Sequence, residues 1–256
     1  MNGEPSDKRR VALVTGASRG IGHAAALALA RAGYHIIALA MARAGYHVVA
    51  LARTVGGLEE LDDAITREGG SATLVPADLT DYQALDRLAA AISQRWGRLD
   101  TFIGNAGMLG PITPLAHVEP SAWDRVMAIN VTANWRLLRT LDPCLRAAPN
   151  GRVVFVSSGA ATSCRAYWGP YSVSKAALEA LARTYAAETA TTNVRVMLVN
   201  PGPLRTAMRA EAMPGEDPLS LKTPEDLAPC FVMLTAQDWA ETGKVFDFPT
   251  GQVVSR

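Results

Sequence analysis

The sequence predicts an α/β fold in which a doubly wound parallel sheet carries helices on both faces. Short β-branched segments alternate along the chain with longer segments rich in Ala and Leu. The short segments are apolar throughout, which is typical of strands that are covered on both faces. No linker rich in Pro, Gly and Ser divides the 256 residues, so we expect one domain over residues 1–256.

Seven segments fit strands of this kind: VALVT (11–15), HVVALA (47–52), ATLVPA (72–77), DTFIGN (100–105), RVVFVS (152–157), VRVMLVN (194–200) and KVFDF (244–248). The longer segments between them fit helices. In residues 81–97, for example, Leu85, Leu88, Ala89 and Ile92 fall on one face of a helix. This order and spacing predict parallel strands joined by right-handed crossovers.

The composition favours a small-molecule ligand over a nucleic acid or a membrane. The formal net charge is +1, and no basic run is longer than residues 8–10, so nothing indicates an anionic macromolecule as partner. The polar N-terminus lacks the apolar core of a signal peptide, and we expect a cytoplasmic protein. Three widely spaced cysteines without a C-x-x-C motif or a Cys/His cluster predict neither disulfides nor a metal site.

The first segment that suggests chemistry is TGASRGIG, residues 15–22, directly after the first predicted strand. Gly16, Gly20 and Gly22 let the backbone turn tightly and approach a pyrophosphate group closely. The following helix offers its unpaired N–H groups and its positive end to that charge. A glycine-rich turn alone is a weak signal, but its place between strand and helix predicts a dinucleotide site.

The second segment is YSVSK, residues 171–175, at the start of an Ala-rich helix. Residues four apart share a helix face, so the ammonium group of Lys175 is expected to lower the pKa of the Tyr171 phenol. An ordinary surface tyrosine and lysine fit this spacing as well. Ser158 favours the chemical interpretation, because it ends a predicted strand thirteen residues upstream, at the edge where parallel sheets present side chains to ligands.

Further motifs follow in a fixed order: ADL (77–79), NAG (105–107), Asn130 within MAINV, and NPGPLRT (200–206). With these motifs the chain resembles the short-chain dehydrogenases/reductases over essentially its whole length. The resemblance implies a Rossmann-type fold and an NAD(P)-dependent enzyme that reduces a carbonyl compound or oxidises the matching alcohol. It also implies a homodimer or homotetramer.

The same resemblance implies a role for each matching residue. Tyr171 is expected to exchange a proton with the substrate oxygen, and Ser158 to orient that oxygen. Lys175 is expected to bind the nicotinamide ribose and tune Tyr171, and Asn130 to hold a water molecule that connects Lys175 with solvent. Asn130 is also compatible with a hydrogen-bonding role at a helix bend.

The cofactor contacts implied by the resemblance extend over the whole carboxyl edge of the sheet. Asp78 is expected to meet the adenine and residues 105–107 the adenosine ribose, although Asn105 fits a bracing role between strands equally well. Residues 201–206 are expected at the carboxamide end. The full set is Gly16, Ser18, Arg19, Gly20, Ile21, Gly22, Arg53, Asp78, Leu79, Asn105, Ala106, Gly107, Lys175, Pro201, Gly202, Leu204 and Thr206.

The residues expected near the adenosine ribose favour NADP(H) over NAD(H). A carboxylate at the end of the second strand would bind both ribose hydroxyl groups and repel a 2′-phosphate. This chain has Ala52 at the matching position, followed by Arg53, and Arg19 lies within the glycine turn. Two arginines without a carboxylate predict a site for the 2′-phosphate. The alternative is that both arginines are merely solvated.

Residues 30–53 contain a tandem duplication of twelve residues. Nine of the twelve pairs are identical, two are Ile/Val exchanges, and the last pairs Met41 with Arg53. If the second copy forms the second strand, Arg53 lies beside the ribose. If the first copy forms it, Met41 takes that position and the surplus residues crowd the adenine site, removing the preference for a 2′-phosphate. We expect the second copy, because it leads into the next helix through a short loop.

The duplication also supports a second hypothesis about function. An insertion next to the second strand could damage the cofactor half of the site, leaving a nucleotide-binding protein with weak or no catalysis. The complete set of Asn130, Ser158, Tyr171 and Lys175 favours an active enzyme.

Overall fold

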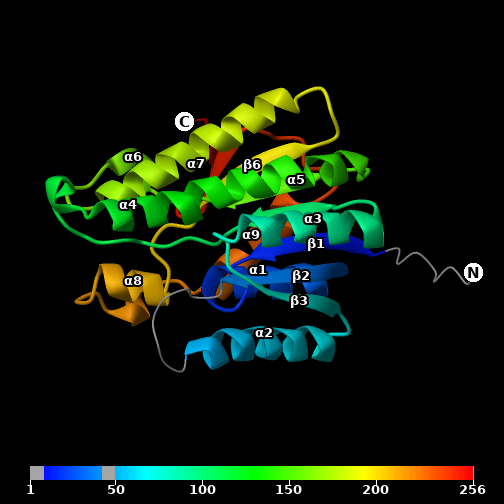
Figure 1. The fold of residues 1–256 in the computed structure, drawn as a ribbon, viewed down its shortest axis with the longest axis horizontal. Coiled ribbons are helices and arrows are strands. Elements are labelled where there is room, and N and C mark those ends of the chain that lie inside the picture. The colour runs from blue at the N-terminus through cyan, green and yellow to red at the C-terminus, as the bar shows by residue number, and fades with distance from the viewer. Residues whose placement is uncertain (1–8, 42–49, 256) are drawn as a thin grey trace, which may run out of the picture.

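The computed structural model of the chain describes residues 9–41 and 50–255. Within these residues, eight strands form one sheet in the order β3-β2-β1-β4-β5-β6-β7-β8, and every neighbouring pair except β7 and β8 is parallel. Figure 1 shows helices on both sides of this sheet. The predicted α/β fold with a doubly wound sheet is confirmed.

Six of the seven predicted strand segments form strands in the sheet, with ends that differ by at most one residue. The strands are β1 (Arg10–Thr15), β2 (Tyr34–Met41), β3 (Ser71–Ala77), β4 (Thr101–Gly104), β5 (Arg152–Val156), β6 (Arg195–Asn200), β7 (Lys244–Asp247) and β8 (Gln252–Val254). The short β8 was not predicted. It forms a hairpin with β7 through a turn that contains Gly251, whose φ is +69°, and three residues are too few for a period to be recognised.

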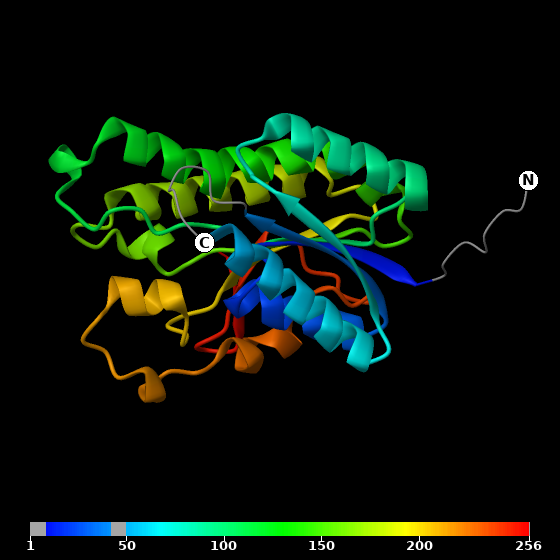
Figure 2. The same cartoon turned by 60° about the horizontal axis from the view of Figure 1, so that its bottom comes forward.

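Two groups of helices cover the sheet, one on each face. The helices are α1 (Gly20–Arg31), α2 (Ala50–Arg67), α3 (Tyr82–Trp96), α4 (Pro120–Met127), α5 (Ala133–Ala147), α6 (Ala160–Ser163), α7 (Gly169–Glu188), α8 (Ala207–Ala212) and α9 (Pro224–Leu234). Helices α3, α5 and α7 pack on one face, and α1, α2 and α9 on the other (Figures 1 and 2). None of the helices in the described ranges has the length and apolarity needed to cross a membrane.

Helix α3 shows how closely an apolar pattern can predict an element. Leu85, Leu88, Ala89 and Ile92 are all buried against the sheet, as the pattern predicts. Asp81 caps the N-terminus by accepting a hydrogen bond from the backbone N–H of Ala84 at 3.0 Å. The helix ends at a glycine in the left-handed conformation.

The prediction for the duplicated segment was wrong, because β2 is formed by the first copy. The strand runs from Tyr34 to Met41, and Met41 ends it in register with Ala77 of β3. Of the second copy, residues 42–49 lie outside the described part of the chain. Its last four residues, which include Arg53, belong to α2, so Arg53 is a helix residue and does not end strand two.

Chain connectivity gives the physical reason for this outcome. The two copies offer nearly the same side chains, so the local sequence cannot decide between them. The first copy begins with the last two residues of α1 and continues through a turn at Ala32 and Gly33, where Gly33 adopts a left-handed φ of +85°. The strand then begins at Tyr34, which is buried, and its hydroxyl donates to the Thr235 carbonyl at 3.1 Å. No surplus is therefore needed between α1 and β2, and the extra residues follow the strand.

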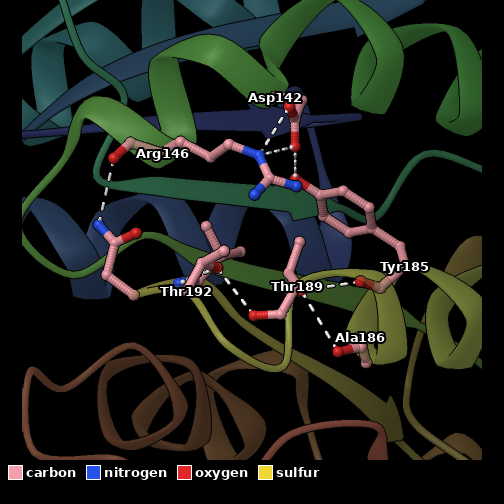
Figure 3. Close-up of polar contacts among 8 residues, drawn as sticks. Asp142, Arg146, Tyr185, Ala186, Thr189 and Thr192 are labelled. Atoms are coloured by element: carbon pink, nitrogen blue, oxygen red, sulfur yellow. Dashed lines mark hydrogen bonds and ion pairs between the residues drawn. The ribbon is translucent and has the colours of Figure 1, made fainter.

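A polar cluster joins the second half of α7 to α5 (Figure 3). The Tyr185 hydroxyl donates to Oδ1 of Asp142 at 2.7 Å, and Nε of Arg146 lies 2.8 Å from both oxygens of the same carboxylate. The Thr189 hydroxyl donates to the Tyr185 carbonyl at 2.7 Å, where α7 ends. This cluster fixes the far end of the helix that carries Tyr171 and Lys175.

Candidate active site

The predicted site residues gather at one edge of the sheet, because they follow the carboxyl ends of neighbouring parallel strands. The glycine turn follows β1, the NAG turn follows β4, Ser158 follows β5, and residues 201–206 follow β6. In a doubly wound sheet the crevice at this edge is the usual place for a ligand. The topology therefore brings together residues that lie far apart in the sequence.

The glycine turn has the conformation that a close backbone approach requires. Gly16 and Gly20 adopt left-handed φ values of +68° and +57°, which disfavour any residue with a side chain. At Gly22, a Cβ atom would clash with the Gly16 carbonyl oxygen and the side chain of Asn105. Arg19 is exposed at the N-cap of α1, where the helix N–H groups begin. The backbone of the turn and the guanidinium group of Arg19 therefore lie at the carboxyl edge of the sheet.

Asn105 braces this turn against β4. Its Nδ2 atom donates to the carbonyl oxygens of Thr15 at 2.9 Å and Gly16 at 3.3 Å. The Thr15 hydroxyl in turn accepts hydrogen bonds from the backbone N–H groups of Asn105 and Ala106, both at 3.0 Å. Of the two roles that the sequence left open for Asn105, the bracing role is the one with contacts in the structure.

The remaining predicted cofactor residues occupy several loops of the same edge. Asp78 uses Oδ1 to accept from the backbone N–H and the hydroxyl of Thr80, both at 2.8 Å, which shapes the turn after β3. Gly202 has a φ of +66°, and a Cβ atom there would lie 2.5 Å from Pro249. Thr206 caps α8 and lies next to Gly20, since its methyl carbon is 3.8 Å from a Cβ built there.

Arg53 was predicted to contact the cofactor because it would end strand two. The strand ends at Met41 instead, so this reason no longer applies. Arg53 belongs to the first turn of α2, and its side chain lies outside what the structure describes. The helix itself packs close to the glycine turn, because a Cβ atom at Gly57 would lie 2.7 Å from the carbonyl oxygen of Ser18. The backbone of Arg53 is four residues, or about one helical turn, from this contact.

At the same edge of the sheet, the side chains of Ser158 and Tyr171 are hydrogen-bonded to each other. Burial raises the pKa of the Tyr171 phenol above its ordinary value, and the hydrogen bond with Ser158 opposes that rise. The spacing of Tyr171 and Lys175 predicted a lowered pKa for the phenol, because it indicates the nearby ammonium group but not the burial. The correction has a chemical consequence, since Tyr171 is protonated at neutral pH.

Lys175 is buried one helical turn from Tyr171. Its Nζ atom donates to the Val156 carbonyl oxygen at 2.7 Å and lies 5.7 Å from the centre of the Tyr171 ring. Burial lowers the pKa of Lys175 to about 8, and the charge of Glu179 opposes the shift. A Cβ atom at Gly107 would come within 3.5 Å of Nζ, so the glycine leaves space beside the ammonium group.

Asn130 lies in a short π-helix, η2 (Ala128–Thr132), between α4 and α5. Its Oδ1 atom accepts from the backbone N–H of Met108 at 2.9 Å, and its Nδ2 atom donates to Ser174 at 2.9 Å. Its backbone carbonyl accepts from the Asn134 side chain at 2.8 Å. A π-turn within a helix often marks a functional position, and here it joins the loop after β4 to the helix that carries Lys175.

Apolar side chains surround Tyr171. Leu109 and Ala160 are buried with it in one small cluster, against which Trp168, Met208 and Ala212 pack. The Trp168 and Tyr171 rings meet edge to face, with centroids 6.0 Å apart. Met208 and Ala212 belong to α8, so this helix covers the site from the side of residues 204–222.

Residues 204–222 form a loop that is closed at its base. A β-bridge joins Leu204 to Lys222, and the Arg205 side chain donates from Nε to the Pro218 carbonyl at 2.8 Å. Within the loop, Arg209 and Glu216 form an ion pair with N···O distances of 2.5 and 2.6 Å. These contacts hold α8 in place over Tyr171.

Several residues that shape the site were not predicted from the sequence. The buried hydroxyl residues Thr15 and Ser174 hydrogen-bond to Asn105 and Asn130, and Met208 packs against Tyr171. The buried Glu179 accepts a hydrogen bond from Ser157, the residue before Ser158. The signal for Glu179 was available, because it lies four residues after Lys175 and therefore on the same face of the helix. Ser174 and Thr15 could not be found in this way, since hydroxyl groups next to a motif are common.

The fold and these contacts define a class of protein: a doubly wound α/β protein with a glycine turn suited to dinucleotide phosphates, in which a half-buried Ser158 meets the buried Tyr171 and Lys175. A family model described as short chain dehydrogenase matches residues 35–217. The chain is 36% identical over 247 residues to the uncharacterized oxidoreductase YciK of Escherichia coli K12, covering 95% of this chain and 93% of that relative. It therefore belongs to the short-chain dehydrogenase family of oxidoreductases.

Two further comparisons concern relatives with a stated cofactor. A short-chain dehydrogenase of Shigella flexneri, solved in complex with NADP, has 36% identity and a TM-score of 0.84, covering 95% of this chain and 99% of that one. An uncharacterized NAD-dependent oxidoreductase of Mycobacterium tuberculosis is 37% identical over 207 residues, covering 80% of this chain and 75% of the relative. The relatives of this chain thus include proteins associated with either cofactor.

Proposed function

We propose that the protein reduces a carbonyl compound with NADP(H) as hydride source, with Tyr171 as the proton donor. The observation that carries this proposal is the position of Ser158, Tyr171 and Lys175 at the edge of the sheet that also holds the glycine turn. Because burial keeps Tyr171 protonated at neutral pH, the arrangement suits donation to a carbonyl oxygen better than removal of a proton from an alcohol.

The residues at this edge fit a nicotinamide dinucleotide. Gly16, Gly20 and Gly22 leave the space in which phosphate groups approach the N-terminus of α1. Thr206 lies directly beyond Gly20, and Gly107 keeps the surroundings of the Lys175 ammonium group open. These residues would hold the pyrophosphate, the carboxamide end and the nicotinamide ribose. The bound dinucleotide supplies the hydride.

The chain's own residues position the substrate and move a proton. Ser158 binds the carbonyl oxygen together with Tyr171 and orients it toward the phenol. As the oxygen gains negative charge, Tyr171 gives up its proton, and the nearby ammonium group of Lys175 stabilises the phenolate that remains. Asn130 keeps the loop at Met108 and the helix at Ser174 in register, which fixes Lys175 relative to the other two.

The preference for NADP(H) rests on two supports. The relative from Shigella flexneri was solved with NADP, and Arg19 is exposed in the glycine turn. Arg53 does not support the preference, because β2 ends at Met41, and a methionine at this position counts against a 2′-phosphate site. Among the residues of this chain, the preference therefore depends on Arg19. The preference is tested by the KM values for NADPH and NADH: Arg19→Ala raises the value for NADPH more than that for NADH. Equal changes would show that Arg19 does not bind a 2′-phosphate.

The apolar side chains around Tyr171 favour a carbonyl compound with an aromatic or aliphatic substituent. Leu109, Trp168 and Met208 pack against Tyr171, and burying an apolar substituent against such side chains is favourable. The experiment is a panel of aryl and alkyl ketones, each paired with a carboxylate-bearing analogue, followed by NADPH absorbance. We expect turnover of the neutral compounds and at least about tenfold lower kcat/KM for the charged ones, which is about 1.4 kcal/mol.

A second candidate function is nucleotide binding with weak or no catalysis. One observation favours it: β2 is the first copy of the duplication, so the surplus follows the strand at the carboxyl edge. NADPH binding without turnover on the panel would support this candidate and contradict the first. Deleting residues 42–53 leaves a single copy, and restored turnover in that variant would identify the duplication as the cause. The cytoplasmic location and the homodimer or homotetramer remain predictions.

A further inference from the structure

A carboxylate that the proposed reaction does not use lies beneath the site, on the face of α7 that is turned to the sheet. Glu179 is 2% exposed. Its Oε1 atom accepts a hydrogen bond from the Ser157 hydroxyl at 2.7 Å, and its Oε2 atom pairs with Arg183 at 3.2 Å. Burying a carboxylate is costly unless it is paired and hydrogen-bonded, so its position calls for an explanation.

The register of α7 places this carboxylate between two cations. Lys175, Glu179 and Arg183 are spaced by four residues, which puts them on one face of the helix. Lys175 is buried, whereas the Arg183 side chain is 37% exposed. Water therefore screens the ion pair between Glu179 and Arg183 but not the interaction between Glu179 and Lys175.

The same two residues of α7 hold consecutive residues at the end of β5. Lys175 donates to the carbonyl oxygen of Val156, and Glu179 accepts from the side chain of Ser157. The next residue along the chain is Ser158. A shift of Glu179 would thus be transmitted both to the ammonium group and to the serine.

We propose that Glu179 is a positioning residue that keeps Lys175 charged and fixes the end of β5 on which Ser158 is carried. The proposal rests on the proposed function for the part that concerns turnover. Its electrostatic part concerns Lys175 alone and holds whether or not a carbonyl substrate is found.

Among the charged groups near Lys175, Glu179 is the main anion. On α7 itself these groups are Tyr171, Glu179 and, one turn further, Arg183. The elements packed against α7 are α4, α5, α6, η2, β6 and the end of β5. On α5, Asp142 and Arg146 lie at Tyr185, ten residues beyond Lys175, Arg136 stacks on Tyr82, and Arg139 is exposed. Helix α4 contributes the exposed Asp124 and Arg125, while α6 and η2 contain no charged residue.

The remaining charge on these elements lies at the far end of the sheet. Arg195 begins β6 and pairs in register with Arg152, whereas Lys175 contacts Val156 at the opposite end of β5. The pKa of Lys175 is lowered to about 8 by burial, and the carboxylate of Glu179 holds it up against a further fall. Without that charge, the pKa of Lys175 would fall further.

The decisive experiment measures the pKa of Lys175 directly. The sequence contains four lysines, so NMR titration of protein labelled with ¹³C at lysine Cε gives few signals, and Lys175→Met assigns the relevant one. Glu179→Gln keeps the size and the acceptor for Ser157 but removes the charge. We expect it to lower the pKa of Lys175 by about one unit, a tenfold change in the protonation constant.

Two matched variants separate charge from structure. Arg183→Gln removes the cation that competes for Glu179, so it is expected to raise the pKa of Lys175, opposite to Glu179→Gln. Ser157→Ala removes a hydrogen bond without changing any charge, and we expect the pKa to stay within about 0.3 units. An unchanged pKa in Glu179→Gln, or equal shifts in all three variants, would overturn the proposal. If Glu179→Gln does not fold, the direction of the shift in Arg183→Gln decides.

Kinetics then test the part that depends on the proposed function. For Glu179→Gln, the alkaline limb of the kcat/KM profile for carbonyl reduction moves to lower pH by the same amount as the pKa, and activity recovers below that limb. A purely structural role would instead lower kcat/KM by one factor at every pH. If the wild type turns over no carbonyl compound while the NMR shifts occur as expected, the proposed function fails and the electrostatic role of Glu179 stands.

Discussion

Helix α7 carries two tyrosines that are nearly equally buried but have opposite surroundings. Tyr171 lies near its start, hydrogen-bonded with Ser158 and 5.7 Å from the Lys175 ammonium group, measured from the ring centre. Tyr185 lies fourteen residues later and donates to the carboxylate of Asp142. One phenol therefore has a neutral partner and a cation nearby, whereas the other is hydrogen-bonded to an anion, which is itself paired with Arg146.

This difference determines what each phenol can do. Burial raises the pKa of both, and at Tyr185 the hydrogen bond to Asp142 raises it further. A phenolate at Tyr185 would face a carboxylate, so that proton is locked in place and the residue serves as a tie between α7 and α5. At Tyr171 the hydrogen bond with Ser158 works in the other direction. The same residue type on one helix is thus structural at one end and suited to proton transfer at the other.

The strongest test of this contrast is the removal of each hydroxyl group in turn. Tyr171→Phe is expected to lower kcat for carbonyl reduction about a thousandfold, because it removes the proton donor while the fold remains. NADPH binding, followed by fluorescence titration, should change by less than about threefold. Tyr185→Phe is the matched control, and turnover within about twofold of wild type is expected there. Comparable losses in the two variants would contradict the contrast.

Ser158→Ala is expected to have the next largest effect. It removes a hydrogen-bond partner of both Tyr171 and the substrate oxygen, which typically reduces turnover about a hundredfold. Since this hydrogen bond opposes the burial of Tyr171, the pKa of the phenol should also rise, which spectrophotometric titration of the folded variant can follow. Unchanged kcat/KM would show that Ser158 does not bind the substrate oxygen.

Much of the fold and most of the site could be predicted from the sequence, because short apolar segments and motifs at strand ends are local features. The glycine turn, Ser158, Tyr171 and Lys175 meet at one edge of the sheet because parallel topology requires it. The chemical roles assigned to them stay predictions.

The choice between the two copies of the duplication could not be predicted in this way. Both copies carry the same Gly-Tyr-His sequence, so each could follow a helix and enter the sheet. The outcome depends on which copy pairs with β1 and β3, a contact between distant segments. A short loop before the next helix favoured the second copy, but residues 50–53 of that copy belong to α2 instead.

Burial was the other property that the sequence pattern could not provide. The spacing of Tyr171 and Lys175 predicts that they are neighbours, which is confirmed, but the direction of the Tyr171 pKa shift depends on how much protein surrounds the phenol. The spacing likewise places Glu179 on the face of Lys175, but it does not show that the carboxylate is buried, since a charged residue in a helix is expected to face water.

The tie at Tyr185 should be visible in stability. Tyr185→Phe leaves Asp142 without the hydrogen bond from the phenol, and we expect the free energy of unfolding to fall by about 1–2 kcal/mol. Urea unfolding at pH 7 measures this difference. Tyr167→Phe is the control, because this tyrosine is 58% exposed, and a change below about 0.5 kcal/mol is expected there. Equal stabilities of all three proteins would mean that the cluster does not hold α7 to α5.

The smallest expected effect is the pH dependence of that tie. The pKa of Tyr185 is raised in the folded protein, while the unfolded chain releases the same proton near pH 10. Above that pH the unfolded state binds fewer protons than the folded state, so the contribution of Tyr185 to stability, complete at lower pH, declines as pH rises, by up to about 1.4 kcal/mol per unit. The stability difference between wild type and Tyr185→Phe should therefore be constant from pH 7 to 9 and smaller by somewhat less than about 1 kcal/mol at pH 10.5. A difference that grows with pH would contradict the locked proton at Tyr185.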